Sequence, residues 1–140
     1  MTHVYFTDRD LGKQFPERLR AAGVTVERHL DLFRHDGSDE QWLEHCGRRG
    51  RIALTHNLRI RYTPNELAAV QDYGVALIVV IGKVPLPQLA ENFVTSQSRI
   101  EAFIERHEPP YIAKLYRPSP AELSRNPSQS GTIKMWFPTP

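Results

Sequence analysis

Asp8 is the residue best placed to do chemistry, because it ends the short, largely apolar segment 3–7 and directly precedes a helical pattern. Such a carboxylate lies at the edge of an α/β sheet where ligands and metal ions bind, outside the carboxyl ends of parallel strands. A similar junction recurs at Asn57, after the segment 51–54, and Asp39 opens a helix between them. Because these positions could converge on one cleft, the sequence predicts metal-dependent chemistry on a phosphodiester.

The ions that suit such a site are Mg²⁺ and Mn²⁺, which are hard cations that prefer carboxylate oxygen and water. Asp8 would be the central ligand, and Asp39 would supply the second carboxylate. Asn57 could ligate through its amide oxygen, but it adds no negative charge, so the affinity should be weaker than with three acids. Each residue also has a plainer role: Asp8 as a turn or cap, Asp39 as a helix-start residue stabilised by the helix dipole, and Asn57 as a loop former.

Basic residues accompany the predicted cleft and could hold a nucleic-acid backbone, whose phosphates dominate affinity. Arg9 and Lys13 lie four positions apart at the start of a helical pattern, and Arg59 and Arg61 follow Asn57. A solvated surface is the alternative for all four. The histidines lack the tight helical spacing of a zinc motif.

The composition is that of a soluble globular protein. The 140 residues are 40% hydrophobic and 24% charged, with a formal net charge of +2, which permits contact with nucleic acid without arguing for it. The single cysteine, Cys46, excludes an internal disulfide and a Cys-rich zinc site. No stretch approaches the ~18 apolar residues of a membrane span. The N-terminus shows no basic segment followed by an apolar one, so a cytoplasmic protein is expected.

The hydrophobic periodicity predicts strands that alternate with helices, and therefore a mainly parallel sheet of five strands covered on both sides by helices. The expected strands are residues 4–7, 24–30, 52–54, 75–81 and 111–116, the last at an edge of the sheet. The expected helices are residues 10–22 with Asp10 as N-cap, 39–48, 65–73 and 86–106.

The composition changes after Arg117. Residues 1–117 form the predicted domain, and residues 118–140 form a Pro- and Ser-rich C-terminal extension, of which 118–131 reads as a linker or mobile loop. The tail ends in an apolar segment that contains Trp136 and Phe137. These side chains could dock on a partner or on a second copy of the chain, or they could pack back onto the domain.

Residues 4–82 resemble the PIN-like domains, in particular the VapC-type toxin ribonuclease branch. The resemblance rests on the segments 5–13, 38–43, 54–60 and 64–67. It implies a PIN-like three-layer α/β/α sandwich and cleavage of RNA that depends on Mg²⁺ or Mn²⁺. It carries Asp8 over as the acid of the first strand and Asp39 as the acid of the second helix. The acid after the third strand falls on Asn57, and Glu66 matches a supplementary acid.

The resemblance also implies a biological setting. Proteins of this branch are toxins of type II toxin–antitoxin pairs, neutralised by an antitoxin that covers the cleft, and they commonly form homodimers. The basic residues Arg9, Lys13, Arg59 and Arg61 would then bind RNA. The departure at Asn57 leaves two readings open: Asp10 or Asp36 could compensate for the missing acid, or the chain is a weakened or inactive module that binds nucleic acid or a protein partner.

Overall fold

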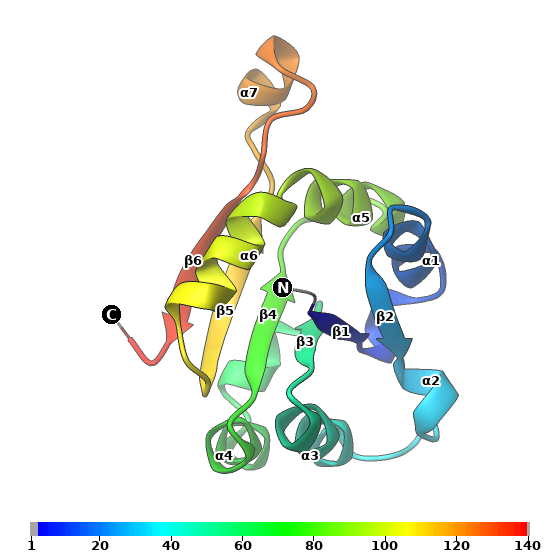
Figure 1. Cartoon of the computed structure of the whole chain (residues 1–140), viewed down its shortest axis with the longest axis vertical. Helices are drawn as coiled ribbons and strands as arrows, with labels where there is room; N and C mark the ends of the chain where they lie inside the picture. Colours follow the sequence, from blue (N-terminus) through cyan, green and yellow to red (C-terminus); the bar gives the residue numbers. More distant parts are fainter. Residues whose placement is uncertain (1–2, 140) are drawn as a thin grey trace.

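The computed structural model describes residues 3–139 and confirms the α/β/α fold (Figure 1). Its sheet has the order β2-β1-β3-β4-β5-β6, in which the first five strands of the chain are mutually parallel and the last is antiparallel to its neighbour. The strands are β1 (Val4–Thr7), β2 (Thr25–Arg28), β3 (Ile52–Thr55), β4 (Ala76–Val80), β5 (Tyr111–Tyr116) and β6 (Thr132–Phe137).

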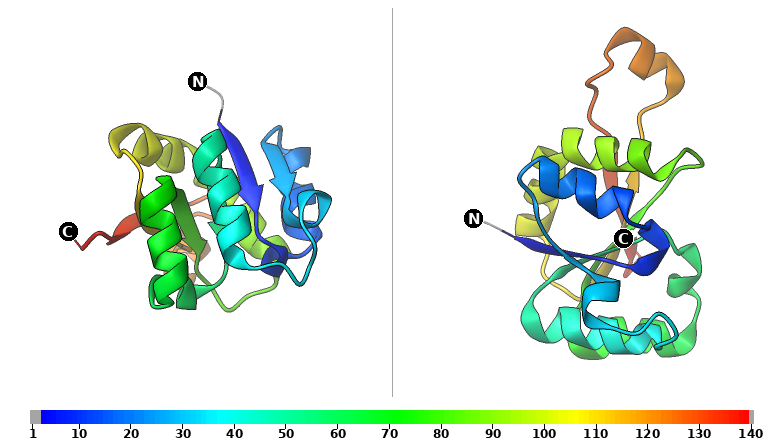
Figure 2. Two further views of the ribbon diagram at one scale, coloured as in Figure 1. Left: turned by 90° about the horizontal axis from the view of Figure 1, so that it is seen from below. Right: turned by 90° about the vertical axis from the view of Figure 1, so that its right-hand side faces the viewer.

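The helices form a layer on each face of the sheet, with α1, α5 and α6 on one side and α3 and α4 on the other (Figure 2). Tyr5 and Phe6 of β1 show how one strand serves both layers, since consecutive side chains point to opposite faces. The helical elements are η1 (Arg9–Leu11), α1 (Gln14–Ala21), α2 (His29–Leu32), α3 (Asp39–Arg49), η2 (Leu58–Arg61), α4 (Pro64–Tyr73), α5 (Leu86–Thr95), α6 (Gln97–Arg106) and α7 (Pro120–Arg125).

The parallel topology gathers polar groups at one edge of the sheet. Every residue of β3 and β4 is buried, as expected for parallel strands that are covered on both faces. These two strands can therefore place exposed polar side chains only beyond their ends. The carboxyl ends of β1 and β3 meet at the edge where α3 and α4 begin, because each parallel crossover returns the chain to the opposite edge.

Two expected helices differ in the structure. The helix expected at residues 10–22 is divided into η1 and α1 by Gly12, which has a φ of 68°. The helix expected at 86–106 is broken at Ser96, which is buried. The Ser96 hydroxyl donates to Asn92 Oδ1 at 3.3 Å and accepts from the backbone N–H of Gly131 at 2.8 Å. The contact with Gly131 links the break to a distant segment, which periodicity cannot report.

The strand at Tyr111–Tyr116 was wrongly expected at an edge. The structure places β5 between β4 and β6, because residues 132–137 form a sixth strand that pairs with it. Between the two strands, residues 118–131 leave the sheet as a projecting arm that contains α7 (Figure 1). A capping box between Ser119 and Glu122 begins this helix. The arm returns at Ser130, whose hydroxyl donates to the Thr95 carbonyl at 2.9 Å.

Candidate functional site

Asp8 joins the carboxyl ends of two neighbouring strands. It follows β1 directly, is only 5% exposed, and its backbone N–H donates to the Leu54 carbonyl of β3 at 2.9 Å. Its carboxylate accepts hydrogen bonds from the Arg9 N–H at 2.7 Å and from the Thr55 hydroxyl at 2.9 Å. Thr55 is the last residue of β3. The sheet thus holds the Asp8 carboxylate in one position at the edge where the sequence predicts a site.

Asp10 faces the same site and is not the helix N-cap that the sequence suggested. The capping side chain of η1 is that of Asp8. The Asp10 carboxylate instead accepts from the backbone N–H of His56, at 3.1 and 3.2 Å to its two oxygens. Its Oδ2 also lies 3.3 Å from the Thr55 hydroxyl, which has a single proton to share between Asp8 and Asp10. Asp10 therefore brings a second carboxylate to the junction of β1 and β3.

Asp39 and Glu66 come to the site from the first turns of α3 and α4. Asp39 Oδ1 accepts from the indole N–H of Trp42 at 3.0 Å, which fixes the carboxylate against the buried face of its helix. Glu66 Oε1 is buried and accepts no hydrogen bond from residues 3–139, although a protonated Glu66 carboxyl can donate to Asp39. The Asp39 charge acts on Asp8, Asp10 and Glu66, so the four acids share one neighbourhood.

Desolvation and neighbouring negative charge raise the pKa values of Asp8, Asp10 and Glu66, although Asp10 is exposed at the surface. Burial, and after it the charge of Asp10, raise the pKa of Asp8 to about 7, against the hydrogen bond from Thr55. Desolvation by the surrounding protein also raises the pKa of Asp10, against its bond from His56. Burial, followed by Asp39, raises the pKa of Glu66 to about 7. Only Asp10 has a nearby positive charge, that of His56, that lowers its pKa, and desolvation outweighs it.

The donor chemistry of the site fits a hard divalent cation. The side-chain donors gathered here are carboxylate and hydroxyl oxygens, and Glu66 Oε1 is a buried oxygen that accepts no hydrogen bond from residues 3–139. The His56 ring is engaged elsewhere, since its Nδ1 lies 2.7 Å from the Val80 carbonyl. Within residues 3–139, no three His, Cys, Asp or Glu side chains already form a cluster of metal-site geometry. The oxygen chemistry suits such a cation, and the cation site itself stays a prediction.

Asn57 lies at the rim of the site and caps a helix. Its Oδ1 accepts from the Arg59 N–H at 3.0 Å at the start of η2, and its own N–H donates to the Thr55 hydroxyl at 3.2 Å. The amide oxygen that the sequence predicts as a ligand is therefore committed to the backbone. Its role as a ligand stays a prediction.

The predicted basic residues lie on two sides of the acids. Arg9 and Lys13 are exposed and line a cleft of about 110 Å³ that also borders Asp8. Arg59 is exposed on η2, and the guanidinium of Arg61, on the same element, packs over the Phe137 ring at 4.8 Å. None of these four cations forms an ion pair within residues 3–139. They are available to an anionic ligand.

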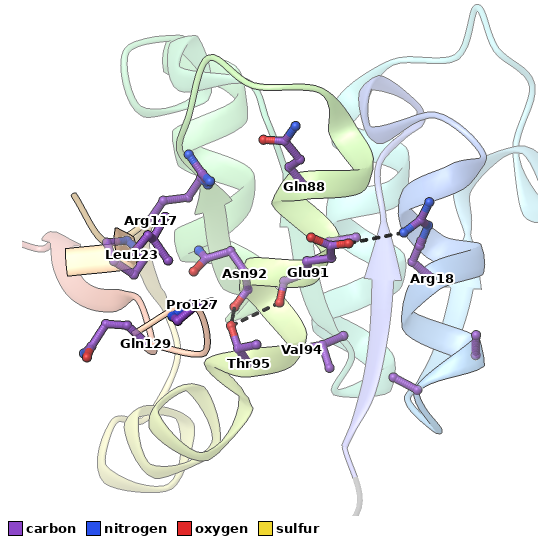
Figure 3. Close-up of a pocket in the computed structure, with 14 residues that line it drawn as sticks. Arg18, Gln88, Glu91, Asn92, Val94, Thr95, Arg117, Leu123, Pro127 and Gln129 are labelled. Carbon is purple, nitrogen blue, oxygen red and sulfur yellow. Dashed lines mark hydrogen bonds and ion pairs between the residues drawn. The ribbon is translucent and has the colours of Figure 1, made fainter. Parts of the chain in front are cut away.

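A larger cavity lies elsewhere and does not share the site's residues. It measures about 600 Å³ and is bounded by α1, α5 and the arm (Figure 3). Arg18 and Glu91 approach within 3.5 Å across it, and the rest of its wall is mainly apolar. Its lining residues include none of the four acids of the site.

The raised pKa of Asp8 leads to a prediction about stability. The folded metal-free protein holds the Asp8 proton more tightly than the unfolded chain does, so this stabilisation is lost as pH rises from about 4 to about 7. Asp8→Asn removes the ionisation and should raise the melting temperature at about pH 8, in excess EDTA, by roughly 3 °C or more. Near pH 4 the difference in melting temperature between Asp8→Asn and the wild type should shrink. Thermal denaturation across this range tests it. Asp72→Asn, at an exposed position of α4, is the matched control, and an equal shift for both variants would contradict the account.

Comparison with known proteins gives the family. Neither a search of curated proteins nor a search of solved structures returned a match to this chain. The family model described as "PIN like domain" matches residues 3–82, which is more than half of the chain. The match spans β1 to β4 and includes all four acids of the site. Among residues 3–139, moreover, no helix has the length and apolar character required to cross a membrane. The chain belongs to the PIN-like domain family.

Proposed function

We propose that this protein is a metal-dependent endoribonuclease. Membership of the PIN-like family indicates a nuclease-type module that contacts nucleic acid. The observation that carries the proposal is the convergence of Asp8, Asp10, Asp39 and Glu66 at the carboxyl edge of β1 and β3. Desolvation and the charge of Asp39 raise the pKa values of Asp8, Asp10 and Glu66, so gathering these acids costs the fold stability and suits a site that binds a cation.

The acids would hold Mg²⁺ or Mn²⁺. Asp8 and Asp39 are the proposed principal ligands, Asp10 supplies the charge that Asn57 lacks, and Glu66 completes the group. A divalent ion bound there lowers the pKa of a water molecule and neutralises charge on phosphate oxygens. The chain itself positions the carboxylates through Thr55 and the His56 N–H.

The substrate would be oriented by the basic residues on either side of the acids. Arg9 and Lys13 at the cleft, and Arg59 on η2, can bind successive phosphates of an RNA backbone. Without a bound ion, desolvation and then Asp39 raise the pKa of Glu66 to about 7. A bound cation would favour its charged form, as a ligand requires.

The biological role we propose is that of a VapC-type toxin in a type II toxin–antitoxin pair, acting on RNA in the cytoplasm. Exposed apolar residues beside the cleft support a protein partner. Leu30 is 57% exposed and lines the cleft that borders Asp8, and Leu32 is 49% exposed on the same short helix, α2. An antitoxin that covers the cleft would bury both, and a homodimer could use the same surface. A small DNA-binding protein encoded by the adjacent open reading frame would support this role.

The second candidate is a weakened or inactive PIN-like module that binds nucleic acid or a protein partner. The specific observation in its favour is Asn57, which places a neutral cap where the family pattern has an acid. In this case RNA would bind without being cut.

The direct test is cleavage of single-stranded RNA by the purified protein with Mg²⁺, with Mn²⁺ and with excess EDTA. The proposal expects fragments with at least one of the two ions and none with EDTA. Binding of RNA without fragments under every condition would favour the second candidate. Equal cleavage in EDTA would reject metal dependence.

A further inference from the structure

Two lysines stand directly opposite each other on the last two strands. Lys114 of β5 and Lys134 of β6 are cross-strand partners, and Lys134 is exposed. Like charges in this arrangement destabilise a sheet. Neither lysine forms an ion pair with any residue that the structure describes. An anionic ligand would relieve the repulsion between them.

Aromatic rings lie among these cations. The Tyr62 side chain, just after η2, belongs to a residue that is 71% exposed, and its ring meets that of Trp136 edge-on, with centroids 5.7 Å apart. The Lys114 ammonium lies 3.9 Å from the centroid of the Trp136 ring. The Arg61 guanidinium lies 5.7 Å from the centroid of the Tyr62 ring. A tyrosine this exposed contributes little to the core, so its ring is available to stack on a ligand.

Arg61 adds a further polar group that lacks a partner. Its guanidinium also packs over Phe137 of β6, and its Nε is buried without a hydrogen-bond partner among residues 3–139. We call the five residues Arg61, Tyr62, Lys114, Lys134 and Trp136 the aromatic–cationic platform.

The platform is built largely from a part of the chain other than the acidic site. In the sequence, Tyr62 lies between Asn57 and the site acid Glu66. Lys114, Lys134 and Trp136 lie on β5 and β6, beyond the segment 3–82 that matches the family. The C-terminal strand thus contributes a surface that the family segment lacks.

We propose that the platform binds an unpaired stretch of RNA, with a base stacked on Tyr62 and the backbone held by Lys114, Lys134 and Arg61. Grooves for single strands combine cations that follow the backbone with aromatic rings on which bases stack. Duplex RNA keeps its bases inside the helix and could use only the cations. An acidic peptide would pair with the lysines but would leave the Tyr62 ring without a matching group. The choice of RNA rests on the proposed function.

The test is fluorescence anisotropy with a labelled single-stranded RNA of about 12 nucleotides, within the ~4–16 nucleotides of known single-strand sites. Excess EDTA prevents cleavage. Tyr62→Ala should weaken binding by about 5-fold or more, whereas Tyr62→Phe keeps the ring and should bind like the wild type. Replacing Lys114 and Lys134 together by alanine should reduce the slope of log affinity against log salt by about 1.4. Arg106→Ala, at an exposed position at the end of α6, is the charge control and should change little.

Three results would overturn the proposal that the platform binds unpaired RNA. Tyr62→Ala could bind the single strand as tightly as the wild type does, or it could lose as much affinity for a duplex of the same sequence as for the single strand. The third is that the protein binds polyglutamate and does not bind RNA. Cleavage is measured in parallel with Mn²⁺. If the wild type and Tyr62→Ala cleave RNA with the same KM, the proposal that the platform binds RNA is rejected and the ribonuclease proposal is retained. If the protein binds single-stranded RNA through Tyr62 but never cleaves it, the ribonuclease proposal is rejected and the proposal that the platform binds RNA is retained.

Discussion

Replacing Asp8 by asparagine should reduce RNA cleavage by about 100- to 1,000-fold and leave the fold intact, as expected when one preorganised electrostatic group is lost from a site. The side chain is 5% exposed and lies between the ends of β1 and β3. Asparagine has the same shape, and its amide oxygen can still accept from Thr55 or from the Arg9 N–H. The substitution therefore removes the charge and little else.

The rate of cleavage of a labelled RNA in Mn²⁺ measures this effect, and circular dichroism checks the fold. Asp72→Asn is the matched control, because it makes the same chemical change at an exposed position of α4 and should cleave like the wild type. Cleavage by Asp8→Asn at the rate of Asp72→Asn would show that Asp8 is a structural cap of η1.

Replacing Asn57 by aspartate should tighten Mn²⁺ binding by about 10-fold, a free-energy change of about 1.4 kcal/mol, and should raise the rate of cleavage. The cap of η2 survives, because aspartate accepts the Arg59 N–H as well as asparagine does. The new carboxylate adds negative charge next to Thr55, whose hydroxyl already contacts Asp8 and Asp10.

Calorimetric titration of Mn²⁺ measures the change in affinity. Asn126→Asp is the control, because Asn126 also caps a turn, by accepting from the Ser128 N–H, but lies on the projecting arm. It should leave the affinity unchanged. A gain in Mn²⁺ affinity for Asn57→Asp but not for Asn126→Asp would identify a metal site that has lost one acid. An unchanged or weaker affinity would mean that position 57 is outside the ligand set and that Asp10 already fills its place.

The buried strands and their polar ends could be predicted from the sequence. The run 75–81 is apolar throughout, and such runs are typical of strands covered on both faces. Asp8 at the end of one strand and Asn57 after another follow from the same reasoning, because the carboxyl ends of parallel strands meet at one edge. Asp39 also lies beside Asp8, as its effect on the pKa of Asp8 shows.

Contacts between distant segments could not be predicted in the same way. The helical pattern is interrupted at Ser96, whose hydroxyl accepts from the N–H of Gly131, far away in the chain. Residues 132–137 form a strand by pairing with β5, and a local sequence pattern cannot predict which strand pairs with which. Asp10 resembles an N-cap in the sequence, and only its contacts with Thr55 and the His56 N–H show that it faces the acids. Its spacing of two from Asp8, across a short turn, was the available signal.

Calorimetric titration of Mn²⁺ into the wild-type protein, Asp8→Asn and Asp72→Asn near pH 7.5 examines most directly whether the clustered oxygens bind a divalent cation. We expect saturable binding by the wild type and by Asp72→Asn, and a loss of that binding in Asp8→Asn. Absence of binding by the wild type, or equal binding by Asp8→Asn, would contradict the account.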